Sequence, residues 1–174
     1  MRESTLLIAG AVVAYVLQIV LAPNIAILGA MPNFMLVYVV IAGMSSQHDG
    51  ITLLAFFSGL ALDLTGTSAV GTMAALFIAV SLVTTRVASY LGSDTVGSST
   101  LIAIVISVLA ELVYAGFYIS TSGVPVLDAL LQRSIPCALY DSALILIALP
   151  VLSQVFSESR PSHNAPISSS IKLR

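Results

Sequence analysis

Long apolar runs separated by short polar segments make up most of the chain. Six such runs occupy residues 5–22, 25–46, 51–66, 70–90, 100–119 and 136–156. A helix needs about 20 apolar residues to cross a hydrocarbon core of about 30 Å, and its backbone hydrogen bonds are then satisfied internally. The pattern predicts an all-α integral membrane protein with six transmembrane helices in one domain, residues 1–156. Because Pro32 and Asn33 interrupt the second run, we expect that helix to be tilted or broken.

The polar segments predict less structure. Residues 122–135 place Pro125 before several apolar residues on one broad helical face, which predicts a short helix on the outer membrane interface. Residues 157–174 contain six serines and two prolines, which predicts a disordered cytoplasmic tail. The first run follows Arg2 and Glu3 and is longer than the ~7–15 apolar residues of a signal peptide, so we expect it to be retained.

Composition narrows the class of protein. The chain of 174 residues is 58% hydrophobic and 8% charged, whereas a soluble domain carries about 25% charged residues. A net charge of −2 without a basic patch argues against nucleic-acid binding. One cysteine and two histidines predict neither a disulfide framework nor a metal site, and no cofactor is expected.

The basic residues predict the orientation in the membrane. With six spans and a cytoplasmic N-terminus, five of the six basic residues lie inside and only Arg133 lies outside; the five are Arg2, Arg86, Arg160, Lys172 and Arg174. The positive-inside rule therefore favours cytoplasmic N- and C-termini.

Three acids fall inside apolar runs, and the one basic residue within a predicted span, Arg86, lies near the end of the fourth run rather than beside them. An ionised side chain at mid-membrane costs about 2.5–3.5 kcal/mol on insertion scales, so such acids face the bundle interior, pair or stay protonated. On the fifth run, four polar and aromatic residues share an arc of roughly 60°; they are Ser107, Glu111, Tyr114 and Tyr118. With Tyr140 and Asp141 of the sixth run they form either an interior polar pocket or a set of interhelical hydrogen bonds, and the second interpretation is favoured.

Small residues accompany the third acid. Ala55, Gly59, Asp63 and Gly66 share an arc of roughly 80° on the third run, which predicts a close packing seam. The pair Gly10 and Ala14 on the first run is typical of a surface that receives a partner helix.

Enzymatic motifs are incomplete. Tyr140-Asp141 resembles one half of an intramembrane aspartyl protease, but the G-x-G-D half is missing before Asp63. Both histidines fall outside the apolar runs, which argues against a rhomboid-like serine protease. We therefore expect a protein that is not an enzyme. A substrate-capture subunit of a transporter stays open.

Residues 31–85 resemble the core of the MreD family, the bacterial rod-shape-determining membrane proteins. The resemblance rests on Pro32-Asn33, a short polar loop, an apolar run ending Gly59-x-x-x-Asp63-Leu64, a turn around Gly66, and Gly71 before the next run. Asn33 stands where the family often has Asp, and the tail after Phe156 has no counterpart in the pattern.

The resemblance implies a non-enzymatic scaffold of the bacterial cell-wall elongation machinery that helps to maintain cell shape. It implies a multi-pass protein of the cytoplasmic membrane that binds an MreC-like partner, and through it MreB, RodA and a class B penicillin-binding transpeptidase. The fold implied is similar to the substrate-capture subunits of energy-coupling-factor vitamin transporters, which makes such a subunit the alternative function. Pro32, Asn33, Gly59, Asp63, Gly66 and Gly71 become the candidate structural and partner-binding residues.

Overall fold

The computed structural model describes residues 2–27, 30–46, 50–66, 70–91, 96–123 and 125–158. Within these ranges the chain is helical and forms no β-strand beyond one isolated bridge. The elements are α1 (Arg2–Val20), η1 (Ala22–Ile25), α2 (Phe34–Ser45), α3 (Ile51–Thr65), α4 (Thr72–Leu91), α5 (Val96–Ser122), α6 (Val126–Ala129), η2 (Leu130–Ser134) and α7 (Ile135–Glu158).

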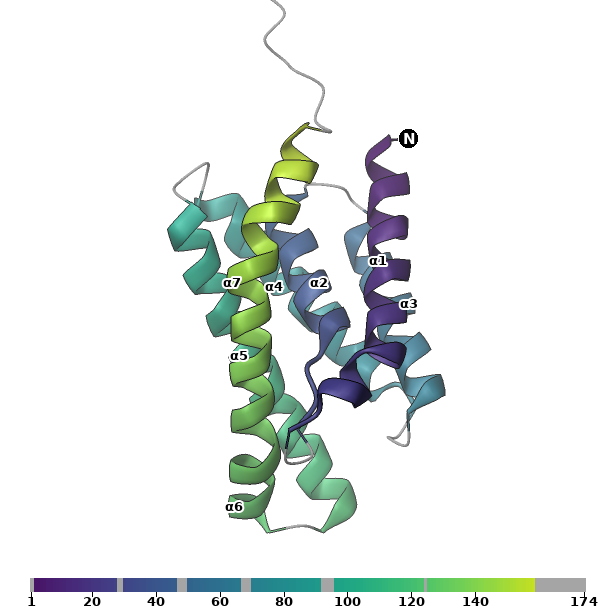
Figure 1. Ribbon diagram of the computed structural model, residues 1–174, viewed down its shortest axis with the longest axis vertical. Helices are drawn as coiled ribbons and strands as arrows, with labels where there is room; N and C mark the ends of the chain where they lie inside the picture. Colours follow the sequence, from purple (N-terminus) through teal and green to yellow (C-terminus); the bar gives the residue numbers. More distant parts are fainter. Residues whose placement is uncertain are drawn as a thin grey trace, which may run out of the picture.

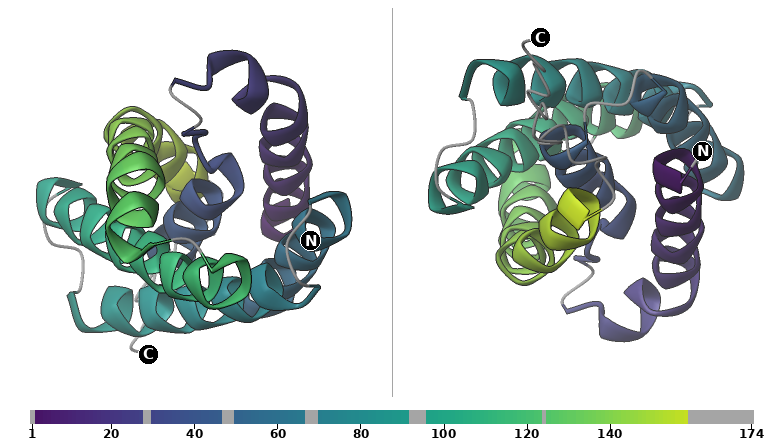
Figure 2. Two further views of the ribbon diagram at one scale, coloured as in Figure 1. Left: turned by 90° about the horizontal axis from the view of Figure 1, so that it is seen from below. Right: turned by 90° about the horizontal axis from the view of Figure 1, so that it is seen from above.

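The main helices form one bundle in which successive helices run in alternating directions (Figure 1). The start of α1 and the end of α7 therefore lie at the same end of the molecule (Figure 1). Viewed along the bundle, α2 lies in the middle with the other helices around it (Figure 2). Helix α2 contacts α1, α3, α4, α5 and α7.

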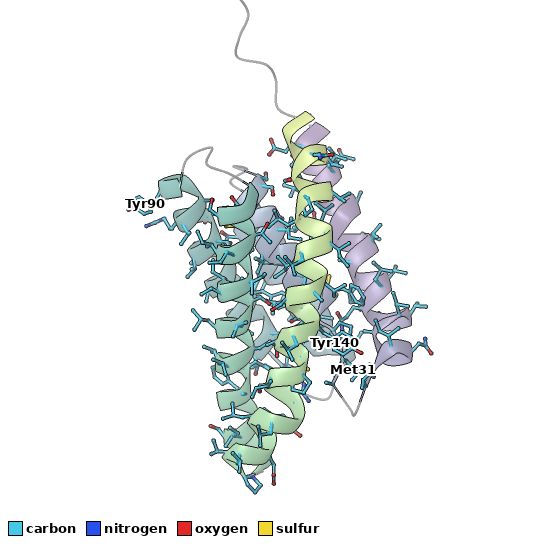
Figure 3. The ribbon with its side chains drawn as sticks, turned by 60° about the vertical axis from the view of Figure 1, so that its left-hand side comes forward. Met31, Tyr90 and Tyr140 are labelled. Atoms are coloured by element: carbon cyan, nitrogen blue, oxygen red, sulfur yellow. The ribbon has the colours of Figure 1, made fainter. Side chains whose placement is uncertain are left out.

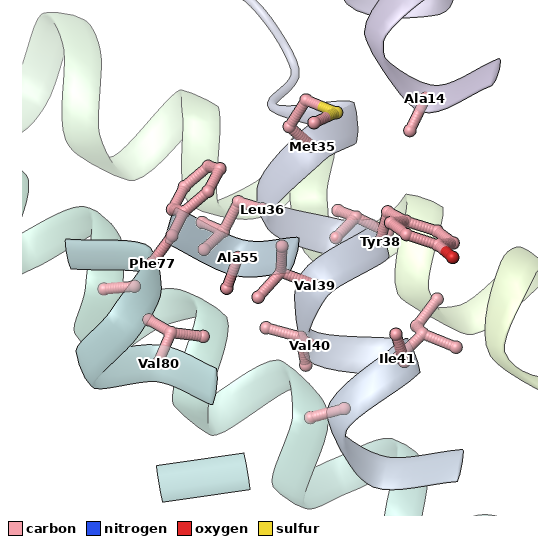
Figure 4. Close-up of a cluster of buried hydrophobic side chains, with 14 of the residues drawn as sticks. Ala14, Met35, Leu36, Tyr38, Val39, Val40, Ile41, Ala55, Phe77 and Val80 are labelled. Atoms are coloured by element: carbon pink, nitrogen blue, oxygen red, sulfur yellow. The ribbon is translucent and has the colours of Figure 1, made fainter. Parts of the chain in front are cut away.

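The position of α2 explains its composition. Every residue from Met35 to Gly43 is buried, so the helix has no polar face. Its 12 residues extend only about 18 Å at 1.5 Å per residue. A close-up of the core shows Leu36, Val39 and Val40 of α2 directed toward Phe77 and other residues of the surrounding helices (Figure 4).

The outer surface is apolar, as a membrane protein requires. Helix α1 exposes about half or more of Ile8, Val12, Val13 and Val16. Among the described residues, four helices are long and apolar enough to cross a membrane, namely α1, α4, α5 and α7, whereas α2 and α3 are shorter. The fold is that of a helical membrane protein.

Several predicted boundaries change. The second run is broken, as predicted from Pro32 and Asn33, but the helix α2 begins only at Phe34, after η1 has ended at Ile25. The fifth run is helical from Val96 to Ser122, well beyond residues 100–119. Helix α7 continues to Glu158, while residues 159–174 of the predicted tail lie outside the described residues.

The short helix predicted within residues 122–135 is present as α6 and η2, and it continues into the next helix. Helix α6 and η2 lead directly into α7, because Leu130 and Ile135 both keep right-handed helical backbone angles. Segment η2 is a π-helical turn, which inserts an extra residue per turn and rotates the residues before it relative to α7. This continuity brings the segment before α7 onto the side of α5.

Candidate functional site

The acid of the third run, Asp63, joins the end of α3 to the start of α4. Its carboxylate accepts hydrogen bonds from the backbone N–H groups of Gly71 (2.9 Å), Met73 (3.0 Å) and Ala74 (3.1 Å). These are donors that the first turn of a helix leaves without an intrahelical partner, and the positive end of the helix dipole favours the carboxylate there. Asp63 is only 2% exposed, so the bonds are shielded from solvent.

Glycines allow the two helices of this hairpin to approach each other. A Cβ atom on Gly59 would lie 2.5 Å from the carbonyl oxygen of Met73 and 2.6 Å from the Cα of Ala74. Gly71 has a φ of +101°, a conformation that glycine adopts without strain. Gly66 ends α3, and its N–H donates to the carbonyl of Leu62. The predicted packing seam around Asp63 is therefore a helix–turn–helix unit.

The start of α2 is held by side chains from three elements. The Asn33 side chain accepts from the N–H of Leu36 (3.0 Å) and caps the helix. Gln18 of α1 accepts from the N–H of Phe34 (2.7 Å) and donates to the carbonyl of Pro32 (3.2 Å). Asp141 of α7 accepts from the backbone N–H of Asn33 through Oδ1 (2.7 Å). The break in the second run thus has its exposed backbone groups satisfied inside the bundle.

Asp141 is also the centre of a buried polar cluster. Its carboxyl group interacts with that of Glu111 on α5, and Glu111 interacts in turn with the Asn33 side chain. Asp141 is 0% exposed and Glu111 is 5% exposed. Oδ1 of Asp141 is hydrogen-bonded, whereas its Oδ2 has no hydrogen-bond partner within the described part of the chain.

A cation completes the cluster. The guanidinium of Arg133 lies 5.2 Å from the ring centroid of Tyr114 and 4.7 Å from that of Tyr118, so it stacks against the aromatic side of α5. It also attracts the carboxylate of Glu111 electrostatically. The prediction that no basic residue neutralises the membrane acids fails here, because η2 brings a residue from outside the predicted spans into the bundle.

The remaining residues of the predicted polar pocket, Ser107 and Tyr140, have different surroundings. Ser107 is 0% exposed, and its hydroxyl has no hydrogen-bond partner among the described residues. The Tyr140 hydroxyl donates to the carbonyl of Ile25 (2.9 Å), so this side chain holds the segment before α2 rather than the acids. Figure 3 shows Tyr140 of α7 at the level of Met31, a residue of the segment before α2.

The structure thus brings together most of the predicted polar pocket. Glu111, Tyr114, Tyr118 and Asp141 meet in one cluster, and Asn33, predicted as a structural and partner-binding residue, joins them. Asp63 is engaged elsewhere, in the α3–α4 hairpin. In the described ranges, no group of three or more acids, histidines or cysteines is arranged to hold a metal ion.

Two residues that contact the start of α2 or the polar cluster, Gln18 and Arg133, were missing from the sequence-based prediction. Arg133, Cys137 and Asp141 recur at intervals of four residues, a helical spacing that places the cation on the face of the acid. Gln18 is an isolated amide in an apolar run, which indicates a residue that faces the bundle interior. Both signals were present in the sequence.

The two small residues of α1, Gly10 and Ala14, pack inside the bundle of this chain. A Cβ atom on Gly10 would lie 2.6 Å from Cε2 of Tyr38, whose hydroxyl donates to the carbonyl of Leu7 (2.7 Å). Ala14 is buried as well. The prediction that Gly10 and Ala14 receive a partner helix is therefore wrong, since both face the bundle and Gly10 packs directly against α2.

The fold defines a helical membrane protein with a buried polar cluster. Comparisons with protein-family models, with curated proteins and with solved structures give no match.

Proposed function

We propose that the protein is a non-enzymatic scaffold of the bacterial cell-wall elongation machinery, similar to MreD. In this proposal it lies in the cytoplasmic membrane, crosses it six times and keeps both ends in the cytoplasm. It binds the membrane helix of an MreC-like partner and acts through that partner on MreB, RodA and a class B transpeptidase.

The observation that carries the proposal is the structural unit formed by the residues of the resemblance. Gly59, Asp63 and Gly71 are separated in sequence by intervals of four and eight residues, yet they build one helix hairpin. Pro32 and Asn33 mark the start of α2, where Asn33 caps the helix. A set of residues that fixes geometry without presenting a reactive group suits a scaffold better than a catalyst.

The arrangement of the helices supports the proposed topology. An even number of crossings places both ends of a chain on one side of the membrane, and α1 starts at the end of the bundle where α7 finishes (Figure 1). Helices α2 and α3 are short, but α2 is enclosed by its neighbours. Short segments inside a helical bundle are tolerated because the surrounding protein shields them from lipid.

Association with a purified MreC-like protein in detergent or nanodiscs tests the proposal. The wild-type protein should retain the partner, whereas Asp63→Ala and Gly59→Leu should retain less, since both distort the α3–α4 hairpin. Asp128→Ala and Gly116→Ala are matched controls, because Asp128 is exposed and a Cβ on Gly116 meets nothing within 4 Å. Size-exclusion chromatography of each variant separates loss of binding from loss of folding.

Two results would contradict the scaffold proposal. One is failure of the folded wild-type protein to bind an MreC-like protein. The other is binding by both hairpin variants at the wild-type level. The neighbouring genes give an independent check, because a scaffold of this kind should be encoded beside an MreC-like or transpeptidase gene.

The buried polar cluster favours a second candidate function, a vitamin-capture subunit of an energy-coupling-factor transporter. Ser107 and Asp141 each keep a polar oxygen without a hydrogen-bond partner in the described part of the bundle, and a bound molecule would satisfy them. Mass spectrometry of the denatured, purified protein tests this alternative. A stoichiometric small molecule would support it, and genes for transporter ATPases beside this one would agree.

A further inference from the structure

The charges of the buried cluster do not balance if both of its acids are ionised. Glu111 and Asp141 then contribute two negative charges, and Arg133 contributes one positive charge. Burial of an uncompensated charge in a bundle surrounded by hydrocarbon is costly, so such groups are paired or neutralised.

The other groups around the acids do not supply the missing positive charge. Among the described residues, the other groups of the cluster are Asn33 at the start of α2, Tyr114 and Tyr118 of α5, which contact Arg133, and Cys137 of α7. Asn33 does not ionise. Tyrosine and cysteine side chains are neutral or negative, never positive.

Three buried polar atoms of the cluster lack a hydrogen-bond partner among the described residues: an acceptor oxygen of Asp141, the hydroxyl of Ser107 and the Nε donor of Arg133. Oδ2 of Asp141 is fully buried and has no hydrogen-bond partner among the described residues, although the carboxyl group of Glu111 is its neighbour. The Ser107 hydroxyl, also 0% exposed and without a partner there, lies one turn from Glu111 on the same face of α5. Buried polar atoms in native proteins normally have a partner, and a proton is a ligand that requires no cavity.

We propose that Glu111 and Asp141 together bind one proton at neutral pH. The proton comes from water and occupies the pair as a carboxylic acid, and the other acid stays ionised as the counter-ion of Arg133. On release, the proton returns to water and the cluster gains one negative charge. The site is therefore a proton-binding site within the membrane bundle, and the inference is independent of the proposed partner.

Infrared spectroscopy of the purified full-length protein in nanodiscs tests the site directly. The wild-type protein at pH 7 should show the carbonyl band of a protonated carboxylic acid, and the band should shift in D₂O. Asp141→Asn should remove it because Glu111 then ionises alone beside Arg133, and Glu111→Gln should remove it because Asp141 then no longer faces a second acid. Asp128→Asn, a change at an exposed acid, should keep it.

The pH dependence of stability gives a second readout for the same site. If the folded protein holds a proton that the unfolded chain releases, the folded state loses stability as the pH rises, by up to about tenfold in the folding equilibrium constant per pH unit. Glu111→Gln should lack this component, so the difference between the two proteins isolates the site from other titrating groups.

Absence of the band in folded wild-type protein at pH 7 would overturn the proposal. Persistence of the band in both variants would overturn it as well, because the proton would then lie elsewhere. If the variants do not fold, the wild-type spectrum and the pH dependence of its thermal midpoint still decide the question. A midpoint that does not fall between pH 5 and pH 9 would count against the site.

Discussion

Two buried aspartates in the same bundle have opposite surroundings. Asp63 is 2% exposed and accepts three backbone hydrogen bonds, two through Oδ2 and one through Oδ1. Asp141 is 0% exposed and accepts one backbone hydrogen bond through Oδ1, while its Oδ2 has no partner among the described residues. Asp141 also has the carboxyl group of Glu111 as a neighbour, whereas Asp63 faces the backbone N–H groups at the start of α4.

The difference shows that burial alone does not assign a role to a membrane acid. A carboxylate whose two oxygens both accept from backbone N–H groups is a structural cap with both of its acceptors satisfied. A carboxylate with one free oxygen beside a second acid is incomplete as a cap. The first arrangement supports the hairpin of the proposed scaffold, and the second supports the proposed proton site.

The largest effect is expected for Asp63→Ala. The change removes three hydrogen bonds to a charged acceptor and leaves N–H groups at the start of α4 without partners. Each buried donor left unsatisfied costs about 1–3 kcal/mol, and single substitutions rarely cost more than about 5 kcal/mol, so we expect a total loss of about 3–5 kcal/mol. The midpoint of unfolding by SDS in mixed micelles measures it. An unchanged midpoint would show that the cap does not stabilise the hairpin.

Gly59→Ala should have the next largest effect. The added Cβ would lie 2.5 Å from a backbone carbonyl oxygen, so α3 and α4 must move apart, at a cost of about 1–3 kcal/mol. Gly116→Ala on α5 is the matched control, since its Cβ meets nothing within 4 Å and alanine favours the helix. Equal midpoints for the two variants would contradict the close packing of α3 on α4.

A smaller effect is expected for Asn33→Ala at the start of α2. This change removes the side-chain cap on Leu36, while the backbone bond from residue 33 to Asp141 remains. Loss of such a cap costs about 0.5–2 kcal/mol. The same unfolding assay measures it. A loss as large as that of Asp63→Ala would mean that the polar cluster, rather than the hairpin, is the main polar support of the bundle.

The sequence predicted the helical membrane fold because hydrophobic runs of membrane length have few alternative structures. It also predicted the break at Pro32 and Asn33, where a missing N–H and a strong capping residue coincide. The grouping of Glu111 with two tyrosines followed from helical spacing alone. These features depend on residues close together in the chain.

Features that depend on distant segments were not predicted. The four-residue spacing of Arg133 and Asp141 was visible in the sequence, but the position of Arg133 beside Glu111 depends on the packing of η2 against α5. The contact between Asn33 and Asp141 joins residues 108 positions apart. Gly10 and Ala14 had the right residue type for close packing, but sequence does not distinguish a helix of the same chain from a helix of a partner.

The paired substitutions Asp63→Asn and Asp141→Asn test the central contrast most directly. At position 63 the new amide N–H₂ must face backbone N–H donors, so we expect a loss of about 1–3 kcal/mol. At position 141 the amide oxygen can keep the bond from Asn33, and the N–H₂ can donate toward Glu111, so the loss should stay below about 1 kcal/mol. We predict a clearly lower unfolding midpoint for Asp63→Asn than for Asp141→Asn, and equal midpoints or the reverse order would contradict the contrast between the two aspartates.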